Sequence, residues 1–310
     1  MRIGIAAESR HAEKRVIIEP PQLGDIAAAH EVLVESGAGK GIGISDGEYE
    51  RAGAKIAAKE DVYGCELVVR LKEPEEEELR LMVPGSTMMS MLHLKGSPSL
   101  DALLKKYGLN SIALEELKDP LGRRMVEASY QAGLQGMKKG FELWGGDPKN
   151  CSVKIMGYGK VAFGAIQYAA RMFARIEILN KHDTARMGEH IPGCDILVNA
   201  IDWPYEKRGK VFLINRGMLK LFKKGAVIAD LISNPAGQSP IETMHPTFLD
   251  DIAFEVDGVT HTSCWSWPGL DPEGVSRRYS IQVAPILKTI ADLGLNALPD
   301  HILKAYTKNA

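Results

Sequence analysis

The sequence lacks an apolar run long enough to span a membrane, because none reaches the ~18 residues that a transmembrane helix needs. It also lacks an excess of either charge. The 38 basic and 40 acidic residues leave a net charge of −2, which gives no reason to expect nucleic acid or a membrane surface as a partner. The chain begins directly with a strand pattern, Met1–Ile5, so we expect no secretory signal. These absences predict a cytoplasmic protein.

Cysteine is scarce, and its four positions are far apart and without C-x-x-C spacing: Cys65, Cys151, Cys194 and Cys264. We therefore expect reduced thiols, as in cytosolic proteins. Neither these cysteines nor the eight histidines have the spacing of metal ligands, so no metal site is predicted.

Glycine, in contrast, forms a pattern typical of nucleotide binding. An apolar strand pattern at Val153–Met156 leads into G-x-G-x-x-A, followed by helical periodicity. Gly157 permits the tight turn, Gly159 leaves the backbone accessible to a phosphate, and Ala162 allows the helix to pack closely on the strand. The free N–H groups at the start of the helix attract a pyrophosphate. The alternative is an ordinary strand–helix turn with coincidental glycines.

Strand and helix patterns alternate along the 310 residues, which predicts an α/β protein with parallel sheets covered on both faces. We expect two Rossmann-like domains around a cleft: a substrate and catalytic domain (1–123 plus 285–310) and a dinucleotide-binding domain (124–284). Two long helical patterns, about 124–144 and 275–293, are expected to join them. The predicted strands are 2–6, 31–35, 67–71, 86–92, 111–114, 153–156, 175–179, 196–200 and 226–231.

Cationic groups follow predicted strands of the first domain at their carboxyl ends, where open parallel sheets bind ligands. They are Arg15, Lys72 and His93. Histidine titrates near neutrality, and a buried lysine near other cations has a lowered pKa, so such a pair can exchange protons with a carbonyl or an imine. Alternatively, His93 is structural and Lys72 forms a surface ion pair beside the acidic run Glu75–Glu78, which we expect to be the solvated first turn of a helix.

In the second domain, the residues expected to contact the nucleotide lie in the glycine turn and at strand ends. They are Gly157, Gly159, Lys160, Val161, Ala162, Asn180, Lys181, His182, Ala200, Ile201, Asp230 and Asn234. Asn180 stands where an acid would bind the ribose 2′-hydroxyl of NAD and repel a 2′-phosphate. Because Lys181, His182 and Arg186 follow it, we expect NADP in preference to NAD; the alternative is that these are solvated loop residues.

Several segments resemble the alanine dehydrogenase/transhydrogenase N-terminal domain: Arg2–Arg15, Val69–Pro74, Met91–Leu94, Glu35–Gly39 and Ser45–Tyr49. Within the family, Gly122–Arg124, Tyr130–Gly133 and Asp230–Pro235 are most similar to the saccharopine dehydrogenase and N5-(carboxyethyl)ornithine synthase branch.

The resemblance implies an NAD(P)-dependent oxidoreductase that joins an amino acid to a 2-oxo acid through an imine, or runs the reverse oxidation. It also implies that Lys72 and His93 are the acid/base pair, and that Arg15 with Arg124 (or Arg123) holds carboxylates. Two departures argue against simple alanine deamination. Ala7 replaces a lysine of the alanine dehydrogenases, and Asn234 replaces their catalytic aspartate.

Two other functions are open: a primary amino-acid dehydrogenase that uses ammonia, and a nucleotide-binding regulatory protein without catalysis. The expected partners are an amino acid and a 2-oxo acid, and a homo-oligomer is also open. An aromatic segment near the chain end contains Trp265, Trp267 and His261. These residues either line the substrate pocket or pack in the core.

Overall fold

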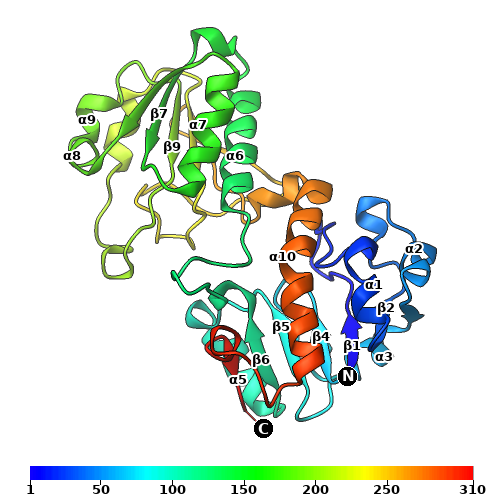
Figure 1. Ribbon diagram of the computed structural model, residues 1–310. Coiled ribbons are helices and arrows are strands. Elements are labelled where there is room, and N and C mark those ends of the chain that lie inside the picture. The colour runs from blue at the N-terminus through cyan, green and yellow to red at the C-terminus, as the bar shows by residue number, and fades with distance from the viewer. Residues whose placement is uncertain (310) are drawn as a thin grey trace. The chain divides into compact units, whose positions relative to one another are not determined.

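The computed structural model describes residues 1–309, which form two compact units (Figure 1). Unit 1 contains Met1–Glu127 and the chain from Pro272 onward, and unit 2 contains Ala128–Asp271. Helix α6 (Ser129–Trp144) therefore begins later than the predicted residue 124 and belongs wholly to unit 2. Helix α10 (Pro272–Leu293) belongs to unit 1, so the boundary predicted after residue 284 falls inside this helix.

The sheet of unit 1 has the order β13-β6-β5-β4-β1-β2-β3, and every neighbouring pair is parallel except β13 with β6. The chain builds β1, β2 and β3 in one direction and then returns to place β4 on the other side of β1. The carboxyl ends of β1 and β4 thus form a topological switch point, where open α/β sheets bind ligands. The strands are β1 (Arg2–Ile5), β2 (Glu31–Glu35), β3 (Lys55–Ala57), β4 (Leu67–Val69), β5 (Thr87–Ser90), β6 (Asn110–Ala113) and β13 (Tyr306–Thr307).

Short helices and α10 surround this sheet. Helix α3 approaches β1 so closely that a Cβ atom on Gly4 would lie 2.2 Å from the carbonyl oxygen of Val62, which explains the glycine within the strand. The helices of unit 1, with 3-10 helices marked η, are η1 (Pro20–Gln22), α1 (Gly24–Ala27), η2 (Lys40–Ile42), α2 (Asp46–Arg51), α3 (Lys59–Tyr63), α4 (Glu76–Leu79), η3 (Leu94–Gly96), α5 (Pro98–Lys106), η4 (Leu114–Glu116), α10 and α11 (Asp300–Leu303).

The sheet of unit 2 has the order β11-β12-β10-β9-β7-β8, parallel except for β11 with β12. After β8 the chain crosses back to place β9 on the other side of β7, so this unit has its switch point between β7 and β9. The strands are β7 (Ser152–Met156), β8 (Arg175–Leu179), β9 (Ile196–Asn199), β10 (Val227–Asp230), β11 (Phe254–Val256) and β12 (Val259–Thr262).

Strand residues of unit 2 alternate between two apolar cores, as strands buried on both faces require. On β9, Ile196 and Val198 belong to the core that includes residues of α6 and α7, whereas Leu197 belongs to the core on the other face. Figure 1 shows α6 and α7 side by side against the sheet. The helices are α6, η5 (Pro148–Asn150), α7 (Lys160–Arg171), α8 (Lys181–Thr184), α9 (Met187–His190), η6 (Tyr205–Lys207), η7 (Arg216–Leu221) and η8 (Trp267–Leu270).

Each predicted strand overlaps an observed one, and β2 and β8 have the predicted bounds. The fold of two Rossmann-like domains is confirmed, but the sheets are mixed, because each has an antiparallel edge strand. β11 and β12 are joined by Asp257 and Gly258, both at positive φ (51° and 81°), a two-residue turn typical of Asp-Gly hairpins. No helix among residues 1–309 combines the length and apolar character needed to cross a membrane.

Candidate functional site

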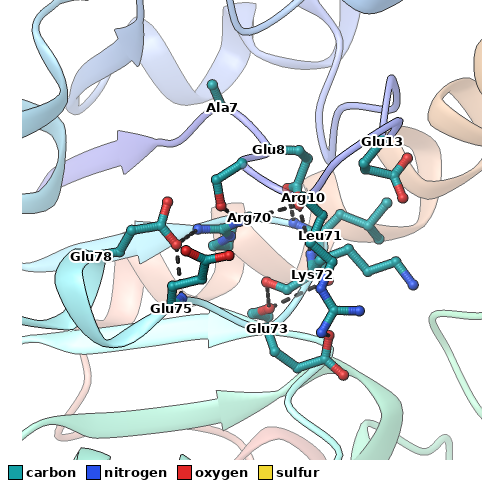
Figure 2. Close-up of polar contacts among 12 residues, drawn as sticks. Ala7, Glu8, Arg10, Glu13, Arg70, Leu71, Lys72, Glu73, Glu75 and Glu78 are labelled. Carbon is teal, nitrogen blue, oxygen red and sulfur yellow. Dashed lines mark hydrogen bonds and ion pairs between the residues drawn. The ribbon is translucent and has the colours of Figure 1, made fainter.

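Lys72 lies just after β4, at the switch point of unit 1. Its side chain is partly buried and extends away from the contacts around Glu8 (Figure 2). The ammonium group makes no hydrogen bond or ion pair with any residue that the structure describes. Burial lowers the pKa of Lys72, and the nearby charge of Arg15 lowers it further, while Glu13 and Glu73 oppose the shift. Lys72 is therefore a cation that is costly to keep charged and that has no fixed counterion.

His93 follows β5, the next strand in the sheet, and is connected to the Lys72 region through Glu73. Its Nδ1 atom lies 2.9 Å from Glu73 Oε1, and Arg10 forms an ion pair with the same carboxylate at 3.0 Å. Burial opposes ionisation of Glu73, but the hydrogen bond with His93 and the charge of Arg10 outweigh it and lower the pKa of Glu73 to about 2. Because a carboxylate only accepts, the proton of this hydrogen bond lies on Nδ1 of His93, and Nε2 is left for another partner.

Arg15 is buried, with 2% of its surface exposed, and it binds Glu13 through Nε (2.6 Å) and through a second, short contact from its terminal nitrogen. The bidentate pair fixes the guanidinium in the neighbourhood of Lys72. The predicted carboxylate-binding arginine is thus a buried cation held by a carboxylate of this chain.

Behind Lys72, the fully buried Arg70 binds acidic groups from two segments. Its guanidinium contacts Glu78 and the hydroxyl of Tyr63, and it lies 3.5 Å from Glu8. Glu78 also accepts a hydrogen bond from Lys59 at 2.9 Å. The prediction that the acidic run Glu75–Glu78 is solvated is therefore wrong for Glu78, which is 2% exposed. Arg70 directly follows β4, and because its charge is buried it requires acidic partners. Glu78, in the first turn of α4, is one of them.

Arg123 and Arg124 lie in an exposed loop. Arg123 forms an ion pair with Asp119 at 2.7 Å, and Arg124 pairs with Lys118 through an isolated β-bridge. Within the described part of the chain, neither guanidinium makes a hydrogen bond or an ion pair with Glu13 or Glu73, the carboxylates near Lys72 and His93. The structure thus brings Arg15, Lys72 and His93 into one region of unit 1 without joining the two loop arginines to it.

The glycine turn lies at the switch point of unit 2. Gly157 has φ +98°, and a Cβ there would lie 2.9 Å from the carbonyl oxygen of Ala200, at the end of β9. Gly159 is the N-cap of α7, and a Cβ there would point into open space. Ala162 is fully buried against the core. The turn therefore has the positive φ, the close approach and the unobstructed helix start that a bound pyrophosphate needs.

Asn180 caps helix α8. Its side-chain oxygen accepts hydrogen bonds from the backbone N–H groups of His182 (2.7 Å) and Asp183 (3.3 Å), and Asp183 accepts one from the backbone of Asn180. An open hollow of about 580 Å³ beside the cap is lined by Lys181, His182, Ala185 and Arg186. The end of β8 therefore presents cationic side chains around a capped helix start.

The loops after β9 and β10 are organised around Asp230. This carboxylate is fully buried and accepts hydrogen bonds from Asn199 (2.9 Å), Ser239 (2.8 Å) and the backbone of Ile232 (3.1 Å). Burial raises the pKa of Asp230. Its side chain stabilises the loop from inside, so a nucleotide contact at this position would involve the surrounding backbone.

Two other predicted contacts lie beside this loop. Ile201, which follows Ala200, donates its backbone N–H to Asn199 Oδ1 at 3.3 Å. Asn234 is 4% exposed, and its Nδ2 atom is buried without a hydrogen-bond partner among the described residues.

The aromatic segment near the chain end is divided between packing and surface. Trp267 is buried in the core of unit 2, and its Nε1 donates to the carbonyl oxygen of Asp230 at 3.0 Å. His261 is buried between Thr243 and the carbonyl of Val259, and burial lowers its pKa. Trp265 is 38% exposed. The packing alternative therefore holds for Trp267 and His261.

Sequence reasoning missed the acidic residues that surround the cations, namely Glu8, Glu13, Glu73, Glu78 and Glu115. Glu8, Glu13 and Glu73 lie inside the segments that carried the family resemblance. The roles of Glu8 and Glu115 depend on strand order, which places the end of β1 beside that of β4 and the end of β6 beside that of β5.

Comparisons with known proteins agree with this architecture. The family described as Alanine dehydrogenase/PNT, N-terminal domain, matches residues 4–135, and Alanine dehydrogenase/PNT, C-terminal domain, matches residues 180–308. Alanine dehydrogenase 1 of Staphylococcus aureus is 27% identical over 341 aligned positions, covering 97% of this chain and 91% of that protein.

Solved structures give the same result. A structure of an L-alanine dehydrogenase superposes with a TM-score of 0.88 at 27% identity, covering 100% of this chain and 96% of that one. The transhydrogenase from Sinorhizobium meliloti superposes with a TM-score of 0.83 at 21% identity, covering 100% and 98%, which supports the fold alone.

Two Rossmann-like units, one with a glycine turn and the other with a partly buried lysine at its switch point, define a two-domain dehydrogenase of the nicotinamide-dependent class. The chain carries both the N-terminal and the C-terminal domain of the alanine dehydrogenase/PNT family, and it is an oxidoreductase.

Proposed function

We propose that the protein oxidises the C–N bond of a small amino acid with NAD(P), producing a 2-oxo acid and ammonia, and catalyses the reverse reductive amination. The relatives named alanine dehydrogenase favour this primary-amine reaction over the secondary-amine reaction that the sequence motifs suggested. We further propose that it works in the cytoplasm.

The observation that carries this proposal is the environment of Lys72. A partly buried ammonium without a hydrogen-bonded counterion lies at a switch point, beside Arg15 and near the Glu73–His93 pair. Its lowered pKa increases the fraction of neutral amine near neutrality, which a general base requires. Such a group is costly for the fold and is typical of a catalytic site.

Proton transfer would be divided between two side chains. In the oxidative direction, neutral Lys72 accepts a proton from the water that adds to the imine, and in the reverse direction its ammonium returns that proton to the hydroxyl that leaves the carbinolamine as water. His93, oriented through Nδ1 by Glu73, presents Nε2 for a hydrogen bond to the substrate. Arg15 is the proposed binding group for the substrate carboxylate, because its charge lies near Lys72, and the substrate would compete with Glu13 for the guanidinium.

The residues of unit 2 fit a dinucleotide. The space that a Cβ on Gly157 would fill, and the open space at Gly159, suit a pyrophosphate at the start of α7. Gly157, Gly159, Lys160, Val161 and Ala162 would hold it, with Asn180, Lys181 and His182 near the ribose and Ala200, Ile201, Asp230 and Asn234 along the adjacent loops. When bound, the nicotinamide supplies or accepts the hydride.

We propose NADP as the preferred cofactor. Asn180 uses its side-chain oxygen to cap α8 and carries no charge that would repel a 2′-phosphate. Lys181, His182 and Arg186 line the adjacent hollow, where Lys181 and Arg186 offer positive charge.

A second candidate, reductive condensation of an amino acid with a 2-oxo acid, is favoured by one specific feature. Asn234 replaces the aspartate expected from the family resemblance, and the Nδ2 of this buried amide has no hydrogen-bond partner within residues 1–309. An amide donor matches an acceptor oxygen, whereas an aspartate matches an ammonium. The carboxylate of a second amino acid offers such an acceptor, and so does the amide of the nicotinamide.

One assay separates the two candidates. Purified protein is given NADPH or NADH, a panel of 2-oxo acids including pyruvate, and either ammonium or an amino acid as amine. Turnover with ammonium supports the primary-amine proposal, and turnover only with an amino acid supports the secondary-amine reaction. Nucleotide binding without turnover on any pair would contradict both.

A further inference from the structure

Two buried carboxylates hold the backbone directly before the proposed acid/base side chains. Glu8 Oε1 accepts the N–H of Leu71 at 2.7 Å, and its Oε2 accepts the N–H of Lys72 at 3.1 Å. Glu115 Oε2 accepts the N–H of Leu92 at 3.1 Å, and its Oε1 accepts the N–H of His93 at 2.6 Å. Each carboxylate thus binds two successive N–H groups, the second of which belongs to Lys72 or His93.

The contact of Glu8 with the Lys72 backbone and that of Glu115 with the His93 backbone occupy equivalent places in the sheet. In the order β6-β5-β4-β1, the inner strands β4 and β5 lead to Lys72 and His93, and the outer strands β1 and β6 lead to Glu8 and Glu115. The regular hydrogen bonding between strands ends at these points, so the backbone N–H groups that follow β4 and β5 no longer have a carbonyl acceptor on a neighbouring strand. A carboxylate from the neighbouring outer strand replaces them with charge-assisted hydrogen bonds.

Burial makes these hydrogen bonds energetically important. The Glu8 side chain is 3% exposed and Glu115 is 5% exposed, so neither carboxylate is solvated and each depends on its N–H donors. Arg70 lies 3.5 Å from Glu8 as the nearest opposite charge. The carbonyl group of Lys72 is also held in place, because Ser90 Oγ on β5 donates a hydrogen bond to its oxygen at 2.6 Å.

The backbone of His93 needs such support. Its φ is +48°, in the left-handed region that residues other than glycine rarely adopt, so this conformation is strained. Two hydrogen bonds that the backbone N–H groups of Leu92 and His93 donate to Glu115 offset this strain and favour the conformation in which Nδ1 reaches Glu73.

We propose that Glu8 and Glu115 are positioning residues, which fix the backbone that carries Lys72 and His93 and thereby place the two side chains for proton transfer. This inference rests on the proposed function for the identity of the acid/base pair. A displacement of about 1 Å at a reacting group can lower turnover ~100-fold, so the two contacts matter for rate without touching substrate.

The test uses Glu8→Gln and Glu115→Gln in the full-length protein. A Gln amide accepts with one oxygen only and turns an N–H donor toward the second backbone N–H, so each substitution releases one of the two contacts. The matched controls are Glu66→Gln, which removes a carboxylate bound to the N–H of Arg2 at the opposite end of β1, and Glu116→Gln, which changes the more exposed neighbour of Glu115.

For variants that keep the wild-type circular dichroism spectrum, kcat falls about 10- to 100-fold while the Kd for NADPH stays within about twofold. A second readout does not depend on turnover. Reductive ¹³C-methylation labels Lys72, identified by its absence in Lys72→Arg, and NMR follows its titration. Because burial lowers the pKa of Lys72, loosening by Glu8→Gln raises it toward the ordinary value.

The outcomes are distinguishable. If Lys72→Met abolishes turnover while both Gln variants and both controls turn over equally, the positioning proposal fails and the proposed function stands. If Lys72→Met leaves turnover unchanged, the proposed function fails, and the Lys72 titration decides the positioning role of Glu8. Should Glu8→Gln not fold, Glu8→Asp shortens the same carboxylate by one methylene and draws it back from the two N–H groups, and a kcat within twofold of wild type would overturn the proposal for Lys72.

Discussion

At the scale of single residues, the account depends on the amine of Lys72. Lys72→Arg keeps the positive charge but cannot lose its proton, and Lys72→Met keeps the length without the charge. We expect both to reduce kcat by at least about 100-fold, with NADPH affinity unchanged, because proton transfer contributes about 100- to 10,000-fold. Stopped-flow turnover and fluorescence titration measure the two quantities. Appreciable activity in Lys72→Arg would show that charge alone suffices.

Asn180 gives a second prediction at this scale. Aspartate caps a helix as well as asparagine does, so Asn180→Asp keeps α8 while it adds a negative charge beside Lys181 and His182. We expect the ratio of kcat/KM for NADPH to that for NADH to fall by about tenfold or more, since an acid at this position repels a 2′-phosphate. An unchanged ratio together with unchanged melting would refute our assignment of the 2′-phosphate to this end of β8.

The residue scale also shows what the sequence could and could not predict. Lys72 and His93 could be named because each follows an apolar strand pattern within a recognisable motif. Glu8 and Glu115 could not, because their partners are backbone groups 64 and 22 residues away, brought near only by strand order. The ion pair of Arg15 with Glu13 is local in sequence, yet alternation of strands and helices gives no sign of it.

At the scale of elements, α6 and α7 pack through glycines. A Cβ on Gly133 would lie 1.8 Å from the carbonyl oxygen of Val161, and one on Gly164 would lie 2.1 Å from that of Tyr130. The two helices therefore approach backbone to backbone beside the glycine turn that begins α7. This packing could not be predicted from the sequence, since glycine within a helical pattern ordinarily lowers the stability of the helix.

We expect Gly133→Ala and Gly164→Ala each to lower the free energy of unfolding by about 1–3 kcal/mol or more, because the helices must separate. Urea unfolding measures the loss, and a weaker Kd for NADPH should accompany it as α7 moves. Gly47→Ala is the control: it lies in α2 with open space around the added methyl, so stability should stay constant or rise by about 0.4–1 kcal/mol. Equal effects at all three positions would rule out close packing as the cause.

Element types and the approximate positions of nine strands were predictable because apolar runs bounded by glycine and polar residues encode them. The missed strands, β3 and β11 to β13, are two to four residues long, too short for a periodic signal. The Asp257-Gly258 dipeptide, which is typical of two-residue hairpin turns, could have predicted the β11–β12 hairpin.

At the scale of the whole molecule, acid stability depends on the buried ion pairs of unit 1. Burial opposes ionisation of Glu78, but Arg70 outweighs it and lowers the pKa of Glu78 to about 2. Its contribution to folding is therefore complete above its unfolded value of 4.5 and disappears as the pH falls toward 2.

We accordingly expect Glu78→Gln to cost about 3–5 kcal/mol at pH 7, as the loss of one partner of a buried pair does, and progressively less in acid. Urea unfolding of the variant and the wild type across the pH series measures this difference. Glu77→Gln, an exposed neighbour in the same helix, should change little. A cost for Glu78→Gln that stays constant down to pH 3 would contradict the pairing.

The two-unit architecture follows from the alternation of strands and helices along the chain. The points where the chain passes between the units could be predicted only roughly. Helical periodicity continues across them, and the actual crossings lie directly before α6 and α10.

The most direct test of the central claim is hydride transfer to an amino-acid carbon. NADPH deuterated at both C4 positions is incubated with pyruvate, ammonium and the protein, and the product is analysed by mass spectrometry. The account predicts an amino acid with one deuterium at Cα, and none formed by Lys72→Met. An undeuterated product, or nucleotide binding without any amino acid across the panel of 2-oxo acids and amines, would contradict it.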